Sequence, residues 1–224
     1  RENKRGDPFD KRSDIGMIAI IDYGVGNIHS VMSALNKLEI ENVLTSDPEV
    51  IKNAAGIILP GVGAFRDAVK SLEDTGLIPL IKKCAADGKP LLGICLGMQL
   101  LYEKNFEDGE YEGLGLLKGE VRSLKPYISK DLKIPHMGWN GLNIKRDSPL
   151  FKYLKKNEFV YYVHSYFARG NSEDILASSE YGIEVPGVVG HKNVMGMQFH
   201  PEKSGPAGLR VLQNFANICQ RKNS

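Results

Sequence analysis

The sequence predicts an α/β fold with a mostly parallel, doubly wound central sheet, helices on both faces and a β-rich C-terminal part. Two observations predict this fold. In the first half of the chain, short strand-like runs alternate with segments whose apolar residues recur at helical spacing. After about residue 114, period-2 alternation of apolar and polar side chains takes over, which is typical of strands.

The N-terminal strands and helices follow one another in regular order. Asp47-Pro48 opens a short helix, because Asp is a good N-cap and Pro fits the first helical turn. Strands separated by helices pair in parallel, and such a sheet is covered on both faces. Strands are predicted at 17–22, 42–46, 56–60 and 90–95, and longer helices at 27–38, 65–74, 77–88 and 98–104.

The C-terminal part reads as strands closed by one helix. His191-Lys192-Asn193 is expected to form a hairpin turn, and the final helix is expected over 205–221. Because no repeat or low-complexity linker interrupts the chain, we expect a single domain over 17–224. Strands are predicted at 119–124, 141–145, 158–168, 174–182 and 187–199.

The first sixteen residues differ from the rest of the chain. The segment RENKRGDPFDKRSDIG is polar, charged and aperiodic, and Met17 then opens the first strand. A secretory signal needs an apolar middle, which this segment lacks. We expect residues 1–16 to be a vector-derived or disordered leader and Met17 to be the natural start. A genuine N-terminal extension is the alternative.

Composition narrows the class of protein. Apolar residues make up 42% and charged residues 25% of the 224 residues, which is typical of globular proteins. A net charge of +2 is too small to indicate nucleic acid or an anionic membrane as partner. No apolar run approaches the roughly 20 residues that span a bilayer. Three cysteines without a CxxC pair predict neither a disulfide framework nor a metal site, and we expect a cytoplasmic protein.

Cys95 is the candidate nucleophile. It lies in Gly93-Ile94-Cys95-Leu96-Gly97, a G-x-nucleophile-x-G pattern between a predicted strand and a predicted helix. The free N–H groups and the dipole of the new helix favour a thiolate there. The alternative is a buried cysteine at a tight turn, an interpretation that suits Cys84 and Cys219, since both lie within helical patterns.

A thiol nucleophile needs a general base, and His200 is the best of the five histidines. His200 follows the apolar run VMGMQF, so it is expected at the edge of the sheet. Pro201 fixes one backbone dihedral, and the Glu202 carboxylate can then orient the imidazole. The alternative is a surface histidine beside a turn proline. Together with the elbow, the HPE motif predicts a Cys-His-Glu triad.

Two further glycine-rich loops follow predicted strands. Pro60-Gly61-Val62-Gly63 can aim backbone N–H groups at an oxyanion, and the N–H of Leu96 is the second expected donor. A simple turn is the alternative for the first loop. Gly24-Val25-Gly26 resembles a dinucleotide loop but lacks the full G-x-G-x-x-G pattern, so no cofactor is expected.

These residues together resemble the class I (triad) glutamine amidotransferases. The matching motifs are GICLGMQ at 93–99, PGVG at 60–63 and HPE at 200–202. Three further stretches, IDYGVGNIHSV (21–31), IPHMGWN (134–140) and FVYYVHSY (159–166), look like the glutaminase subunits of imidazole glycerol phosphate synthase in histidine biosynthesis. The resemblance runs from Met17 to near the C-terminus.

The resemblance implies a reaction and its residues. Cys95 would attack the side-chain amide of L-glutamine to form a glutamyl thioester, and His200 would activate the thiol and protonate the departing ammonia. Glu202 would orient His200, and Gln99, Ser165 and Tyr166 would hold the substrate. Gln99 as a solvated helix residue and Tyr166 as an ordinary strand aromatic are the alternatives.

The resemblance also implies a partner. Ammonia would pass to a separate (β/α)8 cyclase subunit of the HisF type, which makes imidazole glycerol phosphate and AICAR. The expected interface residues are Asn27, Trp139, Tyr161 and Lys203, although Trp139 could be a core residue and Lys203 an ordinary surface lysine. The glutaminase subunit of pyridoxal phosphate synthase, a cysteine peptidase or esterase, and a catalytically inactive binding subunit are the rival interpretations.

Overall fold

The computed structural model describes residues 16–220. These residues form fourteen strands, six α-helices and three short 3-10 helices. The predicted leader falls outside the described residues except for Gly16, so its origin stays a prediction.

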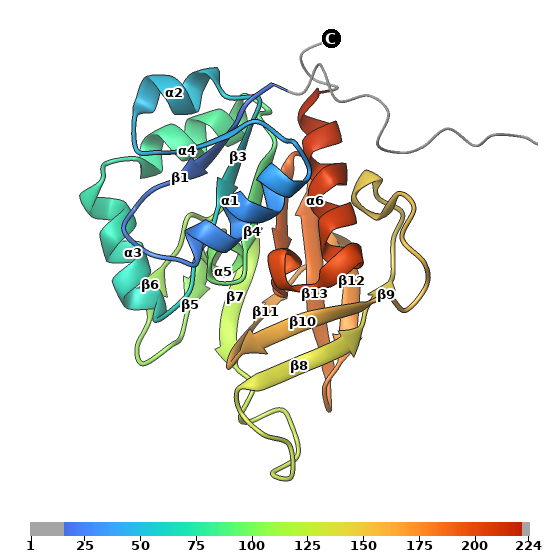
Figure 1. Cartoon of the computed structure of the whole chain (residues 1–224). Helices are drawn as coiled ribbons and strands as arrows, with labels where there is room; N and C mark the ends of the chain where they lie inside the picture. The colour runs from blue at the N-terminus through green and yellow to red at the C-terminus, as the bar shows by residue number, and fades with distance from the viewer. Residues whose placement is uncertain (1–15, 221–224) are drawn as a thin grey trace, which may run out of the picture.

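An eight-stranded sheet forms the centre of the fold, in the order β2-β1-β3-β4-β14-β13-β12-β9 (Figure 1). The five strands from β2 to β14 pair in parallel, and β13, β12 and β9 continue the sheet in antiparallel fashion. The expected mostly parallel sheet is therefore confirmed, and its antiparallel strands come from the β-rich C-terminal part. Its strands are β1 (Ile18–Ile21), β2 (Asn42–Thr45), β3 (Gly56–Leu59), β4 (Leu91–Ile94), β9 (Asn143–Ile144), β12 (Ile175–Glu180), β13 (Glu184–His191) and β14 (Val194–Met197).

Helices cover both faces of this sheet, as predicted. Successive side chains of a strand point to opposite faces, so Ile20 of β1 packs in the core shared with α1 and α6, and Ile21 in the core shared with α3 and α4. Full burial of such a side chain stabilises the fold by roughly 1.5–3 kcal/mol. The helices are α1 (Ile28–Lys37), α2 (Pro48–Asn53), α3 (Phe65–Asp74), α4 (Ile78–Ala86), α5 (Leu96–Leu100) and α6 (Gly205–Gln220).

Two smaller sheets lie beside the central one. In the first, β8 (His136–Gly141) and β10 (Phe159–His164) pair antiparallel, with Tyr161 opposite Trp139 (Figure 1). The second has the order β11-β7-β5-β6. Its strands are β5 (Tyr102–Asn105), β6 (Tyr111–Glu112), β7 (Leu117–Ser123) and β11 (Tyr166–Gly170), and the 3-10 helices are η1 (Pro149–Phe151), η2 (Ser172–Asp174) and η3 (Pro201–Lys203).

Two of the predicted elements were wrong in detail. The helix expected at 98–104 ends at Leu100, because Tyr102 enters β5 and pairs in parallel with Leu117, fifteen positions along the chain. The strand expected at 158–168 breaks at Ser165 into β10 and β11, which belong to different sheets. In both cases the deciding hydrogen bonds come from distant segments, which local periodicity cannot reveal.

The hairpin predicted around residue 192 is confirmed. β13 and β14 pair antiparallel on either side of the turn, and Lys192 has a positive φ of 55°. The strand β8, however, was not predicted from PHMGWN. Met137 and Trp139 alternate there with polar or small residues, but Gly138 and Asn140 have a low preference for strands. Pairing with β10 compensates for that weak local preference.

Candidate active site

Three adjacent parallel strands bring the predicted motifs together. β3, β4 and β14 are neighbours in the central sheet, and PGVG, Cys95 and His200 follow their carboxyl ends. Because parallel strands end at the same edge of a sheet, all three motifs lie at that edge.

Cys95 sits at a strained elbow between β4 and α5. Its backbone adopts φ 54° and ψ −110°, a conformation that non-glycine residues rarely hold. The Cys95 N–H donates to the Met197 carbonyl at 2.7 Å, which fixes the turn against β14. A Cβ on Gly97 would lie 1.8 Å from the Leu59 carbonyl oxygen, and one on Gly93 would lie 2.5 Å from that of Gly97. Both glycines are therefore required by close backbone packing.

His200 and Glu202 form a buried pair at the start of η3. The imidazole Nδ1 lies 2.8 Å from Glu202 Oε1, and the two side chains are only 2% and 1% exposed. Burial alone lowers the pKa of His200, but hydrogen bonds and charges from Cys95 and Glu202 together raise that pKa to about 9. The arrangement therefore favours the imidazolium form of His200.

The second ring nitrogen of His200 is available to the cysteine. Nε2 is buried and makes no hydrogen bond of standard geometry among the described residues. Cys95 and His200 line the same pocket of about 270 Å³. A substrate carbon in this pocket can therefore meet the sulfur and the imidazole together.

A chain of amides surrounds the sulfur. Gln198 Nε2 lies 3.8 Å from Cys95 Sγ, and Gln198 Oε1 accepts a hydrogen bond of 3.1 Å from Gln99 Nε2. Gln99 Nε2 also donates to the Tyr166 carbonyl at 3.2 Å. Since both amide hydrogens of Gln99 are used, its carbonyl oxygen is the group left to face a ligand. With 4% exposure, Gln99 is not a solvated helix residue.

Most of the predicted site residues line the same pocket, and the sequence missed several others. Val62, Gly63, Leu96, Gln99, Ser165 and Tyr166 are all there beside Cys95 and His200, whereas Glu202 and Gly61 are not among the residues that line it. Alternation along β14 and its continuation could have indicated Gln198, two residues before His200. The lining residues that were not named as site residues are Glu107, Pro135, Val163 and His164, of which the last three lie in the quoted stretches 134–140 and 159–166.

One of the expected oxyanion donors, the N–H of Leu96, is not free in this structure. The N–H of Leu96 donates to the Gly61 carbonyl at 3.3 Å, so a carbonyl oxygen occupies the donor expected for the oxyanion. The same loop is held by Tyr23, whose hydroxyl donates to the Pro60 carbonyl. The Gly61 carbonyl must move away before the Leu96 N–H can donate to a substrate.

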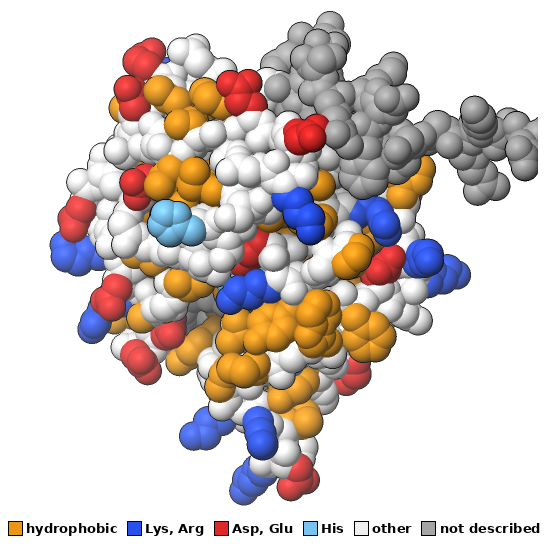
Figure 2. All heavy atoms as spheres, in the orientation of Figure 1, with side chains coloured by type: hydrophobic (Ala, Val, Ile, Leu, Met, Phe, Trp, Pro, Cys, Tyr) orange, Lys and Arg blue, Asp and Glu red, His pale blue; other side chains and the backbone are white. Residues whose placement is uncertain are grey.

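Two of the expected interface residues, Trp139 and Tyr161, lie in one exposed apolar surface. Met137, Trp139 and Phe159 are 60%, 52% and 59% exposed, and Figure 2 shows hydrophobic side chains gathered over β8 and β10. Because Trp139 is 52% exposed, it is not a core residue. Its ring lies 5.9 Å from that of Tyr161. We call Met137, Trp139, Phe159 and Tyr161 the aromatic surface.

This aromatic surface is bonded directly to the triad loop. The His200 N–H donates to the Tyr161 carbonyl at 2.9 Å, and the Tyr161 N–H donates to Ser204 Oγ at 2.9 Å. Lys203, in the same loop, is exposed. Asn27 precedes α1, where its Oδ1 accepts a hydrogen bond from Ser30 at 2.9 Å.

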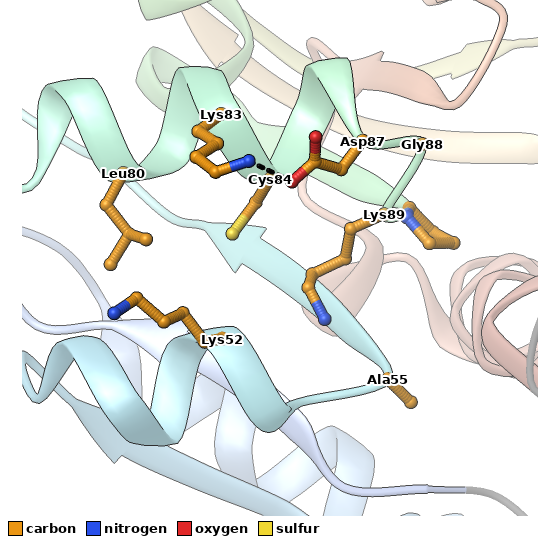
Figure 3. Close-up of a pocket in the computed structure, with 9 residues that line it drawn as sticks. Lys52, Ala55, Leu80, Lys83, Cys84, Asp87, Gly88 and Lys89 are labelled. Atoms are coloured by element: carbon orange, nitrogen blue, oxygen red, sulfur yellow. Dashed lines mark hydrogen bonds and ion pairs between the residues drawn. The ribbon is translucent and has the colours of Figure 1, made fainter.

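A second cavity lies at the opposite end of the strands. It has a volume of about 420 Å³ and includes Ala55 and Pro90, which directly precede β3 and β4. Figure 3 shows Lys52, Lys83 and Lys89 around Cys84, with Lys83 bonded to Asp87. Burial raises the pKa of the Cys84 thiol, and the cavity contains no histidine to act as a base. It therefore lacks the groups of a thiol active site.

Two kinds of feature were not found in residues 16–220. No helix there has the length and apolar character needed to cross a membrane. Nor do these residues contain a group of three or more His, Cys, Asp or Glu side chains that could hold a metal ion.

Comparisons with known proteins agree with this geometry. The glutamine amidotransferase class-I family matches residues 19–219. The imidazole glycerol phosphate synthase subunit HisH of Geobacillus sp. (strain WCH70) is 50% identical over 212 residues, which cover 93% of this chain and 100% of that protein. The HisH subunit of Caldanaerobacter subterraneus subsp. tengcongensis is 52% identical, over 91% of this chain and 99% of its own.

The chain belongs to the HisH subunits of the class-I glutamine amidotransferases. The predicted resemblance and the predicted class of enzyme are therefore confirmed. The fold is also similar to that of PurLQS from Thermotoga maritima, with a TM-score of 0.71 and 21% sequence identity over 91% of this chain and 98% of that one. This last likeness bears on the fold of the amidotransferase and not on its substrate.

Proposed function

We propose that this chain hydrolyses L-glutamine through Cys95, His200 and Glu202 and passes the ammonia to a separate (β/α)8 cyclase subunit. The observation that carries the proposal is the meeting of Cys95 and His200 in one pocket, with Glu202 bonded to the far side of the imidazole. The relatives named HisH support imidazole glycerol phosphate synthase as the complex. Three unpaired, buried thiols suit a reducing compartment such as the cytoplasm.

The proposed reaction starts from a Cys95 thiolate and a His200 imidazolium. The Cys95 thiolate attacks the δ-carbon of glutamine, and the His200 imidazolium gives its proton to the nitrogen as the C–N bond breaks. Ammonia leaves and a glutamyl thioester remains. The neutral imidazole then removes a proton from water, which attacks the thioester and releases glutamate and the thiolate.

The other pocket residues fit the ends of a glutamine molecule. Gln99 presents its carbonyl oxygen, and Glu107 adds a half-buried carboxylate whose Oε2 accepts from the Phe65 N–H at 2.8 Å. Burial raises the pKa of Glu107, so a positively charged partner would stabilise its ionised form. We assign the α-ammonium group of glutamine to these two acceptors. Ser165 and Tyr166 complete the pocket wall.

The occupied oxyanion donor predicts low glutaminase activity of the free subunit, and partner docking is expected to raise it. The Leu96 N–H is occupied by the Gly61 carbonyl, so the oxyanion of a tetrahedral intermediate would lack this donor. Rotation of the Gly61–Val62 peptide removes that carbonyl and turns the Val62 N–H inward. Each oxyanion donor contributes about two to three decades in rate. We propose that the cyclase subunit and its ligand favour the rotated peptide.

The aromatic surface is the proposed docking site. It combines large apolar side chains with direct hydrogen bonds to the His200 loop, so a partner seated there can act on the triad. Lys203, in the η3 loop, and Asn27, just before α1, are also proposed to lie within the interface.

The test measures glutamate release with and without the synthase barrel subunit and its ligand. Glutamine hydrolysis should rise by orders of magnitude in the complex, and the complex should form imidazole glycerol phosphate from glutamine. Cys95→Ala should abolish both, whereas Cys84→Ala, which removes a thiol from the distant cavity, should leave them intact. Equal hydrolysis with and without the partner would contradict the coupling. Activation by the pyridoxal phosphate synthase barrel, or peptide hydrolysis without a partner, would favour a rival function.

A further inference from the structure

Two buried histidines touch each other at the wall of the proposed glutamine pocket. His136 in β8 is 0% exposed and His164 at the end of β10 is 6% exposed. His136 Nδ1 lies 2.9 Å from His164 Nε2. On the outer sides, His136 Nε2 lies 2.8 Å from Asn140 Oδ1, and His164 Nδ1 lies 2.8 Å from the Tyr166 carbonyl oxygen.

These contacts require more protons than two neutral imidazoles carry. A carbonyl oxygen only accepts, so His164 Nδ1 needs a hydrogen, and His136 Nε2 needs one to face Asn140 Oδ1. The contact between the two ring nitrogens needs a third hydrogen, because two lone pairs at 2.9 Å repel each other. Two neutral imidazoles have two N–H hydrogens in total. The arrangement therefore contains one extra proton and one positive charge.

The orientation of Asn140 does not remove this requirement. Its Nδ2 donates to the Glu180 carbonyl at 2.9 Å. Rotating the amide would give His136 a donor, but it would place Oδ1 against the Glu180 carbonyl oxygen. Both ends of the histidine pair therefore face acceptors.

The surroundings place the extra proton on the His136 side. Its ring is stacked between Tyr181, at 3.9 Å and 18°, and Tyr162, at 4.8 Å and 21°, and aromatic faces attract cations. Burial lowers the pKa of His136, while the bond to Asn140 raises it. Burial lowers the pKa of His164 to about 3, despite its bond to the Tyr166 carbonyl. The titratable groups that face the pair or share its pocket are Tyr162, Tyr181, His200, Cys95 and Glu107.

The pair is connected to the catalytic sulfur. The Tyr166 carbonyl accepts from both His164 and Gln99, and Gln99 is bonded to Gln198, which reaches Cys95 Sγ. His164 itself lines the pocket. A change at His136 can therefore move the pocket wall without touching the substrate.

We propose that His136 and His164 share one extra proton and that His136 is a positioning residue for the glutamine pocket. Its kinetic consequence rests on the proposed glutaminase function, whereas the proton count does not. The proton is present at low pH and leaves as pH rises, and one of the three contacts then loses its hydrogen. The pocket wall around His164 then loses a hydrogen bond that holds it in position. KM for glutamine therefore rises, while the triad still turns over bound substrate.

The proton count is tested by nitrogen-15 NMR of the histidine-labelled full chain across a pH series. The pair should carry three N–H hydrogens in mildly acidic buffer and lose one as pH rises. Asn140→Asp should move this loss to higher pH, because a carboxylate stabilises the cation, and Asn140→Leu should move it to lower pH. Asn171→Asp, the same change at the exposed start of η2, should have no effect. Two hydrogens at every pH at which the fold persists, or equal behaviour of both Asn140 variants, overturns the proposal.

The positioning role is tested by glutaminase kinetics of the complete complex. KM for glutamine should rise about tenfold over the pH range in which the proton is lost, because a charged hydrogen bond becomes a neutral or broken one. His136→Gln should show the raised KM without that pH dependence, whereas His191→Asn, at an exposed histidine of β13, should behave as wild type. A KM of wild type that does not change over this range overturns the positioning role. If wild type hydrolyses no glutamine, the proposed function fails, and the NMR result still decides the proton count.

Discussion

Nδ1 of His200 lies 2.8 Å from Oε1 of Glu202, with both side chains almost completely buried. The carboxylate orients the imidazole and stabilises its charged form. Glu202→Gln keeps the shape but removes the charge, so kcat/KM for glutamine should fall by about two to four decades in the activated complex. Glu173→Gln, an exposed carboxylate in η2, is the matched control and should retain full activity. An unchanged rate in Glu202→Gln would exclude the triad role.

The pH dependence of stability provides a second test of this pair. His200 has a folded pKa raised to about 9, above the roughly 6.5 of an unfolded histidine. A raised pKa means that the stabilisation is fully present below about pH 6.5 and is lost as pH rises through about 9. Urea unfolding of wild type and Glu202→Gln should therefore differ most at the acidic end of this range. A difference that grows with pH would contradict the assigned direction.

Much of the fold was predictable because local pattern and tertiary structure agree there. The apolar runs of β1, β3 and β4 are buried on both faces, and the helices between them carry one apolar stripe each. The elbow at Cys95 was equally clear from its G-x-nucleophile-x-G pattern. Gly93 is required by the nearby backbone of Gly97, whereas Gly97 itself is required by the distant Leu59 carbonyl.

The rest depended on contacts between distant segments. Tyr102 continues a helical pattern in the sequence, yet pairing with Leu117 places it in a strand. Glu107 reaches the pocket only because its loop returns to the start of α3, where it accepts from the Phe65 N–H. The proton shared by His136 and His164 depends on four segments meeting in the interior. The local periodicity of a sequence does not indicate such contacts between distant segments.

The close packing of the elbow predicts a large effect of one methyl group. Gly97→Ala would place a Cβ 1.8 Å from the Leu59 carbonyl oxygen, so backbone must move. We expect a loss of about 3 kcal/mol in the free energy of unfolding, at the upper end of ordinary overpacking. Gly141→Ala, whose Cβ would meet only ordinary contacts of 3.8 Å, is the control and should change little. Urea denaturation of both variants measures the difference.

Backbone strain at Cys95 predicts that glycine at this position gives a more stable protein than alanine. The residue holds φ 54° and ψ −110°, which costs a residue with a Cβ on the order of 1–3 kcal/mol. Glycine avoids most of this cost but loses about 0.5–1 kcal/mol more conformational entropy on folding. Cys95→Gly should therefore be more stable than Cys95→Ala by about 1 kcal/mol, as measured by urea unfolding. At unstrained positions the opposite order is expected, so a more stable alanine variant would show that the elbow is relaxed.

Side chains of the aromatic surface are predicted to contribute to the binding of the barrel subunit. Trp139 and Phe159 expose large rings on paired strands, and the Tyr161 carbonyl between them accepts from the His200 N–H. Trp139→Ala should weaken binding of the barrel subunit by about 30-fold or more, the effect of losing a buried aromatic anchor. Tyr153→Ala removes an equally exposed ring, 56% accessible, just after η1 and should leave affinity unchanged. Titration of the labelled barrel subunit with each variant measures the two dissociation constants. If both substitutions weaken binding equally, the interface lies elsewhere.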